Sequence, residues 1–500
     1  MGGKMSKDKK STVLTAIVIG AGMRGAVYSQ YAQMYPDRLK IVGVADPREY
    51  YRRKLQQQFS IQEDNCFSDW SEASQRDRMS DCVIITTPDR LHKDPAVAFA
   101  KKGYNILLEK PMAVNEEDCR EIVKTCTENS VTLAVCHVLR YTPWANKLRE
   151  LIDSGVIGEV VNINHTEPVG YWHFAHSYVR GNWHNEAKSS NSLLAKCCHD
   201  VDLINFWMAD RRCTNVSSFG HLSHFNKENK VGFWHFAHSF VRGNWKREDQ
   251  SSCSLLQKCC HDVDLINYWM PGKKCRRVSS FGYLSHFTIA DKPRGAASRC
   301  MECPASIESQ CPYSAKKIYL DQIKMGHNGF PVCVIAEEPS VESVTTALKT
   351  GPYGVCVYDN DNDVMSNQVV NMQFEGGATA TLTMMAFTKS VCTREVKVYG
   401  TKGQLSCTAT GSPVIQHFDF LTGQSHEYPA EPTRVRGMSG HGGADFHCIH
   451  SFISSVANDN KENIMTGPEE SLAGHVLVFA AEKARKENRV VTLQADGTYN

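Results

Sequence analysis

The sequence predicts an α/β protein: an N-terminal Rossmann domain with a doubly wound parallel sheet, followed by a C-terminal α/β domain with a large, mostly antiparallel sheet. Three observations predict it. Apolar, β-branched strands alternate with helices over residues 13–140, which is typical of a parallel sheet. Residues 368–374, 379–385 and 395–399 alternate in period two instead, as antiparallel strands do. The chain has 500 residues, more than a single hydrophobic core usually serves.

Composition excludes several classes of protein. Hydrophobic residues make up 42% and charged residues 22%, which is ordinary for a globular chain. The formal net charge is only +2, so we expect no nucleic-acid partner. No apolar run approaches the roughly 18 residues of a transmembrane helix. Twenty cysteines without an apolar leader segment favour a reducing, cytoplasmic compartment.

The first twelve residues are interpreted as a flexible basic tail. Met1–Ser6 fits the pattern for myristoylation of Gly2, and the lysines that follow can supply an electrostatic second signal. The alternative is a solvated tail that begins with Met-Gly by chance. Membrane association is therefore expected only if Gly2 is lipidated.

A glycine-rich turn lies between the strand Thr15–Ile19 and the helix Ala26–Met34. In this context the first glycine permits the turn, the second lets a pyrophosphate approach, and the third lets the helix pack on the strand. The helix N-terminus favours the phosphates. The predicted phosphate site comprises Gly20, Gly22, Met23, Arg24 and Gly25.

The next strand, Ile41–Ala45, ends at an acidic residue, Asp46. A carboxylate at this place holds the ribose hydroxyls and disfavours a 2′-phosphate. The predicted cofactor is therefore NAD in preference to NADP, although Arg48, Arg52 and Arg53 lie nearby.

Three further strands, Cys82–Thr86, Asn105–Leu108 and Val131–Val135, continue the parallel sheet, and Asn115 is expected to cap a helix. Ligands of such a sheet lie beyond the carboxyl ends of the strands. The other predicted cofactor-binding residues follow these ends: Thr87, Pro88, His92, Glu109, Lys110 and Arg140. Lys110 suits an acid–base or electrostatic role, and an ordinary surface lysine is the alternative.

At this point the sequence resembles the glucose–fructose oxidoreductase, inositol dehydrogenase and rhizopine-catabolism family (Gfo/Idh/MocA). The matching segments are Ala16–Gly25, Thr87–His92, Glu109–Pro111, Arg140–Pro143, Gly155–Val160, the HDVDL helix and Gly400–Leu405. The resemblance implies hydride transfer between a nicotinamide cofactor and a sugar or polyol carbon. It also implies that Lys110 lies beside the nicotinamide and the substrate hydroxyl.

An internal duplication interrupts the second domain, residues 141–500. Residues 169–225 align without gaps on residues 231–287, with 41 of 57 positions identical and a constant offset of 62. A single extra unit is not a solenoid. We therefore expect only one copy to occupy the native slot, with a weak preference for the first, because it is synthesised first.

The first copy opens with a loop, residues 171–183, in which aromatic side chains alternate with polar ones. Flat rings bury the C–H face of a sugar while polar groups bind its hydroxyls, and an aromatic subunit interface is the alternative. The predicted substrate-binding residues are Trp172, His173, His176, Arg180, Asn182, Trp183, Lys196 and Asp202.

A helix is predicted over residues 192–208, with His199 and Asp202 on one face. The family resemblance implies that His199, or its counterpart His261, takes the hydroxyl proton as the hydride leaves. Many family members have an aspartate four residues earlier, where this chain has Ala195 and Gln257. A Lys110–His199 pair, tuned by Lys196, replaces that aspartate in our interpretation. A buried histidine without catalytic duty is the alternative.

Three cysteines, Cys300, Cys303 and Cys311, resemble half of a zinc knuckle. The sequence shows no evident fourth ligand, although Cys275 or His327 could complete the set. A thiol-rich loop without metal is the favoured interpretation.

The leading functional prediction is a nicotinamide-dependent oxidoreductase of a sugar or polyol, assembled as a homo-oligomer through the C-terminal sheet. A redox-assisted sugar lyase or epimerase keeps the cofactor and changes the net reaction. A non-catalytic dinucleotide-binding sensor is the third class, suggested by the missing aspartate and the duplication.

Overall fold

The computed structural model describes most of the chain outside the first twelve residues and parts of the duplicated region. The described residues are 13–168, 184–185, 190, 194, 196–208, 211–219, 246–247, 260–270, 273–283, 286–360, 362, 364–388, 393–431, 437–438, 440–494 and 496–500. Among these residues, no helix is both long enough and apolar enough to cross a membrane. The predicted lipid site at Gly2 and the basic tail lie outside the described residues.

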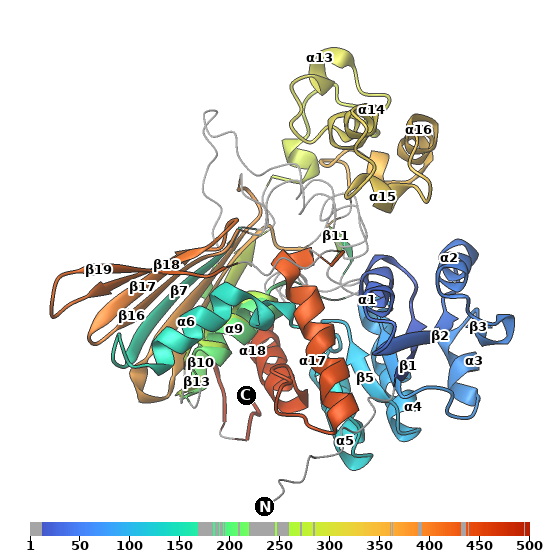
Figure 1. Ribbon diagram of the computed structural model, residues 1–500. Helices are drawn as coiled ribbons and strands as arrows, with labels where there is room; N and C mark the ends of the chain where they lie inside the picture. The colour runs from blue at the N-terminus through green and yellow to red at the C-terminus, as the bar shows by residue number, and fades with distance from the viewer. Residues whose placement is uncertain are drawn as a thin grey trace, which may run out of the picture.

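The N-terminal domain is a six-stranded parallel sheet with helices on both faces (Figure 1). Its strands, in sheet order, are β3 (Cys66–Phe67), β2 (Leu39–Ala45), β1 (Leu14–Ile19), β4 (Cys82–Ile85), β5 (Asn105–Leu108) and β6 (Leu133–Val135). Its helices are α1 (Met23–Met34), α2 (Glu49–Phe59), α3 (Trp70–Gln75), α4 (Lys93–Lys101) and α5 (Glu116–Glu128). The sheet order reverses between β1 and β4, which confirms the doubly wound arrangement.

Local signals set these elements. Every strand of the sheet except the short β3 is dominated by buried apolar residues, as a sheet covered on both faces requires. The predicted cap of α5 is confirmed, because Oδ1 of Asn115 accepts a hydrogen bond from the N–H of Asp118 at 2.8 Å. Three acidic residues in the first turn complement the helix dipole.

A helix from the far end of the chain completes the core of the N-terminal domain. In α17 (Ala444–Asn458), Phe446, Ile449 and Phe452 pack in one cluster with Tyr28 and Tyr31 of α1. Figure 1 shows α17 running between the two sheets. The two domains are therefore joined by a shared hydrophobic core.

The C-terminal domain is a mostly antiparallel sheet with helices on the face toward the N-terminal domain (Figure 1). Its strands, in sheet order, are β19 (Ser425–Pro429), β18 (Val414–Asp419), β17 (Gly403–Thr408), β16 (Glu395–Gly400), β7 (Val160–Pro168), β15 (Thr379–Met385), β14 (Asn367–Phe374), β13 (Lys273–Tyr283), β10 (Arg211–Phe219) and β20 (Val491–Thr492). Its helices are α6 (Pro143–Asp153), α9 (Cys198–Phe206), α12 (Cys260–Tyr268) and α18 (Pro468–Lys486). The period-two pattern predicted β14 to β16 to within one residue.

The two copies of the duplication take the same position. Helices α9 and α12 coincide, as do the rings of Phe206 and Tyr268. Strands β10 and β13 run in register at the offset of 62, and both pair with β14. Two side chains cannot occupy one volume, so we infer a single slot that only one copy at a time can fill. Each contact in the slot belongs to one copy at a time, and the Cys198/Cys260 and Cys213/Cys275 pairs are equivalent positions.

Helix α9 (Cys198–Phe206) lies within the helix expected over residues 192–208, part of which falls outside the described residues. One difference from the sequence-based expectations stands out. A small helical subdomain, residues 288–356, was not predicted at all. It comprises α13 (Ala305–Glu308), a π-helical turn (Lys316–Leu320), α14 (Asp321–Lys324), α15 (Val332–Ile335) and α16 (Val341–Thr350), with several short 3-10 turns, and lies at the top of Figure 1. Short helices of this kind leave little periodicity to read.

Candidate active site

The glycine-rich turn has the geometry of a phosphate cradle. Gly20 has a φ of +92°, and a Cβ there would come within 2.6 Å of the Thr86 carbonyl oxygen. Helix α1 begins at Met23 with Gly22 as its N-cap, and no side chain caps it. The first N–H groups of α1 can therefore bind an anion. The residues present fit the pyrophosphate of a dinucleotide.

Asp46 lies at the end of β2 and is buried against this turn. Its Oδ2 accepts a hydrogen bond from the N–H of Ala21 at 2.7 Å. Arg48 donates to the same carboxylate from its backbone at 2.9 Å and from its guanidinium at 2.8 Å. The carboxylate is thus fixed beside the glycine turn, with a partly exposed arginine across it.

Arg24 connects the glycine turn to the end of β5 and to α17. Its guanidinium pairs with Glu109 at 2.5 Å and with Asp445 of α17 at 2.9 Å, and it donates to the Tyr28 hydroxyl at 2.6 Å. Burial alone would raise the pKa of Asp445, but Arg24 and His441 hold that pKa well below its usual range. The predicted cofactor residues Arg24 and Glu109 therefore use their side chains within the protein.

His92 holds together the loops that follow β4 and β5. Its Nδ1 lies 2.6 Å from the carbonyl oxygen of Pro111, and its Nε2 lies 2.8 Å from that of Thr87. The ring is 1% exposed. Both nitrogens face backbone carbonyls, so His92 positions the Thr87–Pro88 loop and the Lys110 segment.

Lys110 follows Glu109, whose carboxylate accepts the Lys110 backbone N–H at 2.6 Å. Burial lowers the pKa of Lys110 to about 8, with the carboxylates of Glu109 and Asp89 opposing and the charges of Lys196 and Arg24 adding to the shift. These interactions place Lys110, Lys196 and Asp89 around one site. Such a perturbed lysine at the carboxyl end of a parallel sheet indicates a functional role.

A group of buried histidines lies next to Lys110. The rings of His137 and His199 are 5.3 Å apart, and the ring of His475 stacks on His137 at 5.2 Å. Burial lowers the pKa of His199 well below its ordinary value, and the charges of Lys110 and other neighbours lower it further. His441 lies 6.4 Å from His199, between ring centres. His199 is therefore neutral near pH 7 and able to accept a proton.

His137 and His475 were not predicted. His475 accepts the N–H of Met112 at 2.9 Å, and its Nδ1 lies 2.7 Å from the carbonyl oxygen of Ser471. Burial lowers its pKa to about 4. His137 directly precedes the 3-10 turn η3 (Val138–Tyr141), whereas His475 lies in α18. The two are far apart in the chain, and no local pattern in the sequence marks them.

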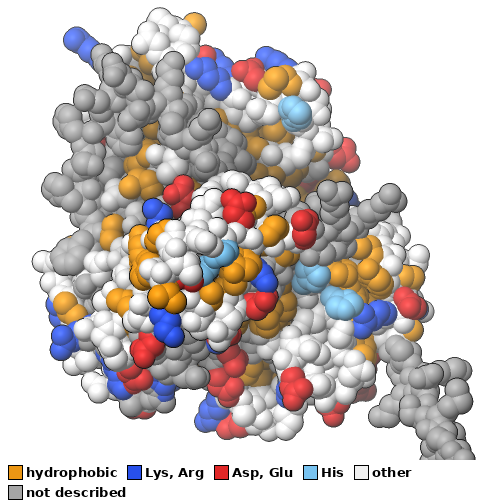
Figure 2. Space-filling view, turned by 60° about the vertical axis from the view of Figure 1, so that its left-hand side comes forward, with side chains coloured by type: hydrophobic (Ala, Val, Ile, Leu, Met, Phe, Trp, Pro, Cys, Tyr) orange, Lys and Arg blue, Asp and Glu red, His pale blue; other side chains and the backbone are white. Residues whose placement is uncertain are grey.

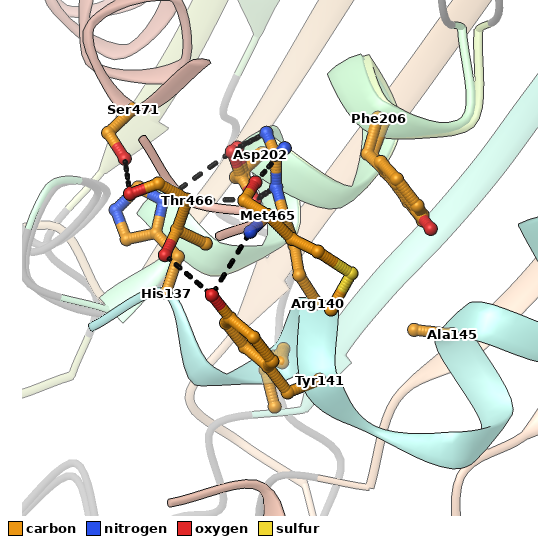
Figure 3. Close-up of polar contacts among 12 residues, drawn as sticks. His137, Arg140, Tyr141, Ala145, Asp202, Phe206, Met465, Thr466 and Ser471 are labelled. Carbon is orange, nitrogen blue, oxygen red and sulfur yellow. Dashed lines mark hydrogen bonds and ion pairs between the residues drawn. The ribbon is translucent and has the colours of Figure 1, made fainter. Parts of the chain in front are cut away.

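The structure pairs Arg140 with Asp202, two residues predicted to bind cofactor and substrate respectively. Arg140 donates to both carboxylate oxygens of Asp202 and to the carbonyl oxygen of Met465 at 2.7 Å. In the second copy, Asp264 takes the same place at 2.7 Å. Figure 3 shows the guanidinium directed at Asp202 and Tyr141 directed at Thr466. Both charges are buried, so this pair fixes the slot helix to η3 (Val138–Tyr141).

A second buried ionic group lies on the sheet side of the slot. Arg394 contacts Glu167 at 3.2 Å and also pairs with Asp200, while Nε2 of His165 lies 2.9 Å from Asp200. Asp262 replaces Asp200 in the second copy. The slot helix is therefore held by ion pairs on both sides, through aspartates that each copy supplies.

Two sets of donor atoms within the described residues lie within 4.8 Å of one another: His137 with Asp202 and Asp264, and His165 with Asp200 and Asp262. Each set counts one aspartate from each copy. Because only one copy fills the slot, each set reduces to one histidine and one aspartate. Neither therefore offers the ligands of a metal centre.

Several predicted residues lie outside the described part of the chain. These are Trp172, His173, His176, Arg180, Asn182 and Trp183, together with the side chain of His261. Lys196 is buried in the slot next to Lys110. Cys275 lies in β13, and His327 is exposed beyond α14.

Comparison with known proteins identifies the class. Residues 14–137 match the oxidoreductase family with an NAD-binding Rossmann fold, and residues 149–231 match the C-terminal alpha/beta domain of the same family. These two segments of the chain are thus similar to the two domains of Gfo/Idh/MocA oxidoreductases.

Individual relatives are similar over part or all of the chain. The 2,7-anhydro-N-acetylneuraminate hydratase of Escherichia coli (strain K12) is 31% identical over 41% of this chain and 53% of its own length. The D-xylose 1-dehydrogenase [NADP(+)] of Haloarcula marismortui is 36% identical over 18% of this chain and 25% of its own length. A levoglucosan dehydrogenase in complex with NADH and L-sorbose shares the fold, with a TM-score of 0.59, 14% identity and coverage of 96% and 99%. The chain spans about half the length of the first of these relatives.

Proposed function

We propose that the protein transfers a hydride between a nicotinamide cofactor and a CH–OH carbon of a sugar or polyol. The observation that carries the proposal is the proximity of Lys110 to the buried His199: the charge of Lys110 helps to lower the pKa of His199, and burial lowers the pKa of both residues. A proton acceptor and a cation at the substrate oxygen are what oxidation of an alcohol requires.

The cofactor fits the N-terminal domain through two groups. The N–H groups at the start of α1 would hold the pyrophosphate, and Asp46 would accept the ribose hydroxyls. The bound nicotinamide supplies the hydride acceptor. We propose NAD over NADP because a 2′-phosphate would meet the Asp46 carboxylate. To bind a 2′-phosphate, the Arg48 guanidinium would have to break its hydrogen bond to Asp46. One similar protein is named as an NADP-dependent dehydrogenase.

In the proposed step, Nε2 or Nδ1 of His199, or of His261 when the second copy is in place, accepts the hydroxyl proton as the hydride leaves the same carbon. The Lys110 ammonium donates a hydrogen bond to the substrate oxygen, which becomes a carbonyl. The products are the ketone or lactone, the reduced cofactor and one proton on the histidine. Arg140 and Arg394 position the slot helix through its aspartates.

The substrate class rests on the family and on relatives named for sugars. The undescribed loop that carries Trp172, His173, His176, Arg180, Asn182 and Trp183 remains our proposed binding surface, with Lys196 at the edge of the site. The face drawn in Figure 2 mixes acidic and basic side chains without a patch of one sign.

A second candidate keeps the same site and changes the net reaction. The Escherichia coli relative is named a hydratase of an anhydro sugar, and a hydride that is removed and later returned allows such a reaction without net oxidation. Lys110 and His199 serve both reactions.

One experiment separates the candidates. A library of sugars, polyols and anhydro sugars, deuterated at the CH–OH carbon, is incubated with the protein and NAD. Net nicotinamide reduction with deuterium in the cofactor supports the dehydrogenase. A changed sugar without net reduction supports the second candidate. No conversion and no cofactor binding would contradict both.

The pH profile tests the assigned groups. Activity in the oxidation direction should rise with pH as His199 loses its proton, at a pH below the ordinary pKa of histidine. It should fall above a pH of about 8, as Lys110 becomes neutral. Lys110→Arg should remove the alkaline limb, because arginine keeps its charge. An unchanged alkaline limb in that variant would remove Lys110 from the assignment.

A further inference from the structure

The helical subdomain, residues 288–356, has a very small core of its own. Its buried hydrophobic cluster is Cys300, Ala315, Ile318, Tyr319, Leu320, Val332, Val344, Leu348 and Tyr353. Its helices are mostly single turns, which are marginal without tertiary support. Small units of this kind usually need a disulfide or a metal ion in addition to their core.

Four cysteines surround one cavity at the base of this subdomain. The cavity is lined by Cys300, Cys303, Cys311 and Cys356, with Pro293, Ala296, Ala297, Ile307, Glu308, Ser314 and Tyr358. None of the four takes part in a disulfide. The structure thus supplies a fourth cysteine, Cys356, for the three-cysteine motif. The fourth ligands suggested by the sequence, Cys275 and His327, do not line this cavity.

The backbone holds the motif and Cys356 together. Cys300 donates its N–H to the carbonyl oxygen of Gly354 at 2.8 Å, and Cys356 donates to that of Ser298 at 2.8 Å. Arg299 and Val355 form an antiparallel bridge between these two segments. Cys300 and Cys356 therefore lie on neighbouring strands of backbone, although 56 positions separate them in the sequence.

The turn after Cys300 brings the other two thiols to the same side. Cys303 donates its N–H to the Cys300 carbonyl oxygen at 3.4 Å, and α13 leads from there to Cys311. Cys303 and Cys311 are partly exposed, so an ion can enter from solvent. The four sulfurs are not yet at ligand spacing, and rotation about their Cα–Cβ bonds is needed to close them on an ion.

The geometry points to a structural zinc site in which Cys300, Cys303, Cys311 and Cys356 bind one Zn²⁺ as thiolates. Four cysteine ligands with a two-residue spacing in the first pair are typical of closed, tetrahedral zinc centres. Binding releases the thiol protons to solvent and involves no redox change. No other protein ligand is needed, so the site has no open position for catalysis.

The place of the cavity indicates what the ion would do. Cys300 belongs to the small core of the subdomain, whereas Cys356 belongs to the core of the antiparallel sheet, against which Cys311 also packs. A zinc ion bound by all four would fasten the subdomain to the sheet. This role is independent of the proposed hydride transfer.

Metal analysis of the full-length protein, purified with a non-thiol reductant after expression with added zinc, tests the proposal directly. We expect about one equivalent of zinc per chain, released when a mercurial reagent titrates the thiols. Protein without stoichiometric zinc would overturn the proposal, and so would iron with visible absorbance.

Two serine variants locate the ion. Cys303→Ser should reduce bound zinc well below one equivalent, and the partly exposed position makes a general folding failure avoidable. Cys333→Ser is the matched control, since Cys333 lies in the same subdomain, is also partly exposed and does not line the cavity. Equal zinc loss from both variants would overturn the assignment. Removing zinc from the wild-type protein with a chelator should lower its thermal midpoint and leave cofactor affinity unchanged.

Discussion

The two halves of this molecule build their parts of the site in different ways. In the N-terminal half, the turn at Gly20, the acid at Asp46 and the lysine at Lys110 each follow directly on a strand of one sheet. In the C-terminal half, the groups around His199 come from segments as distant as His137, His441 and His475. The site residues of the N-terminal half follow one another along the chain. The positions of those in the C-terminal half depend on which copy of the duplication fills the slot.

This difference predicts where substitutions should reduce activity or stability most. A residue of the parallel sheet is present only once, so no second copy can replace it. A residue of the slot helix acts through buried ion pairs with Arg140 and Arg394, and the duplication supplies it twice. The largest effects are therefore expected outside the duplicated segments.

The strongest test of this contrast is Lys110→Ala. We expect turnover to fall by about 10²- to 10⁴-fold, because the variant lacks the cation at the substrate oxygen, while NAD affinity stays nearly unchanged. Steady-state kinetics and calorimetry measure the two quantities. Lys101→Ala, at the end of α4, is the control. Full activity in the Lys110 variant would exclude this lysine from the mechanism.

Arg140→Leu should have the next largest effect, on stability. It would leave the slot aspartate buried without its partner, at a cost of about 3–5 kcal/mol in the free energy of unfolding. Denaturant titration gives this value. Arg53→Leu removes an exposed pair with Glu63 and should leave the free energy of unfolding nearly unchanged, because solvent screens exposed ion pairs. Similar losses in the two variants would contradict the buried role of Arg140.

A smaller effect is expected from Asp46→Asn. The amide keeps an acceptor for the Ala21 N–H but loses the charge, so NAD affinity should fall by about 1.5–3 kcal/mol, the range for hydrogen bonds to charged groups. The difference in affinity between NAD and NADP should become smaller for the same reason. Calorimetry with both cofactors measures it, and tighter binding of NADP by the wild-type protein would overturn the predicted preference.

The smallest effect is expected from removing either copy of the duplication. Deleting residues 169–230 leaves the second copy joined to β7, and deleting residues 226–287 leaves the first copy joined to the subdomain. Both proteins should be monodisperse and bind NAD as the full chain does, because one copy fills the slot. Aggregation of both would show instead that each copy is structural.

The N-terminal half was more predictable from the sequence than the C-terminal half. The parallel sheet, the Asn115 cap and strands β14 to β16 were predicted because strand ends, caps and periodicity are local signals. Asp202 was predicted to bind substrate, yet its carboxylate lies on Arg140, 62 positions away. His475 and Asp445 enter the site through packing of α17 and α18, which no short pattern reveals. The cysteine motif was visible, but its fourth member was hidden by distance along the chain.

The shared slot has a consequence for genetics. Every charged or histidine group that anchors the slot helix or faces the site is identical in the two copies: Lys196 and Lys258, His199 and His261, Asp200 and Asp262, Asp202 and Asp264. A harmful change in one copy can be masked, because the intact copy can take the position. We therefore expect the duplicated half of the site to be buffered against single mutations, so that a phenotype from this region would require a matching pair of changes 62 positions apart.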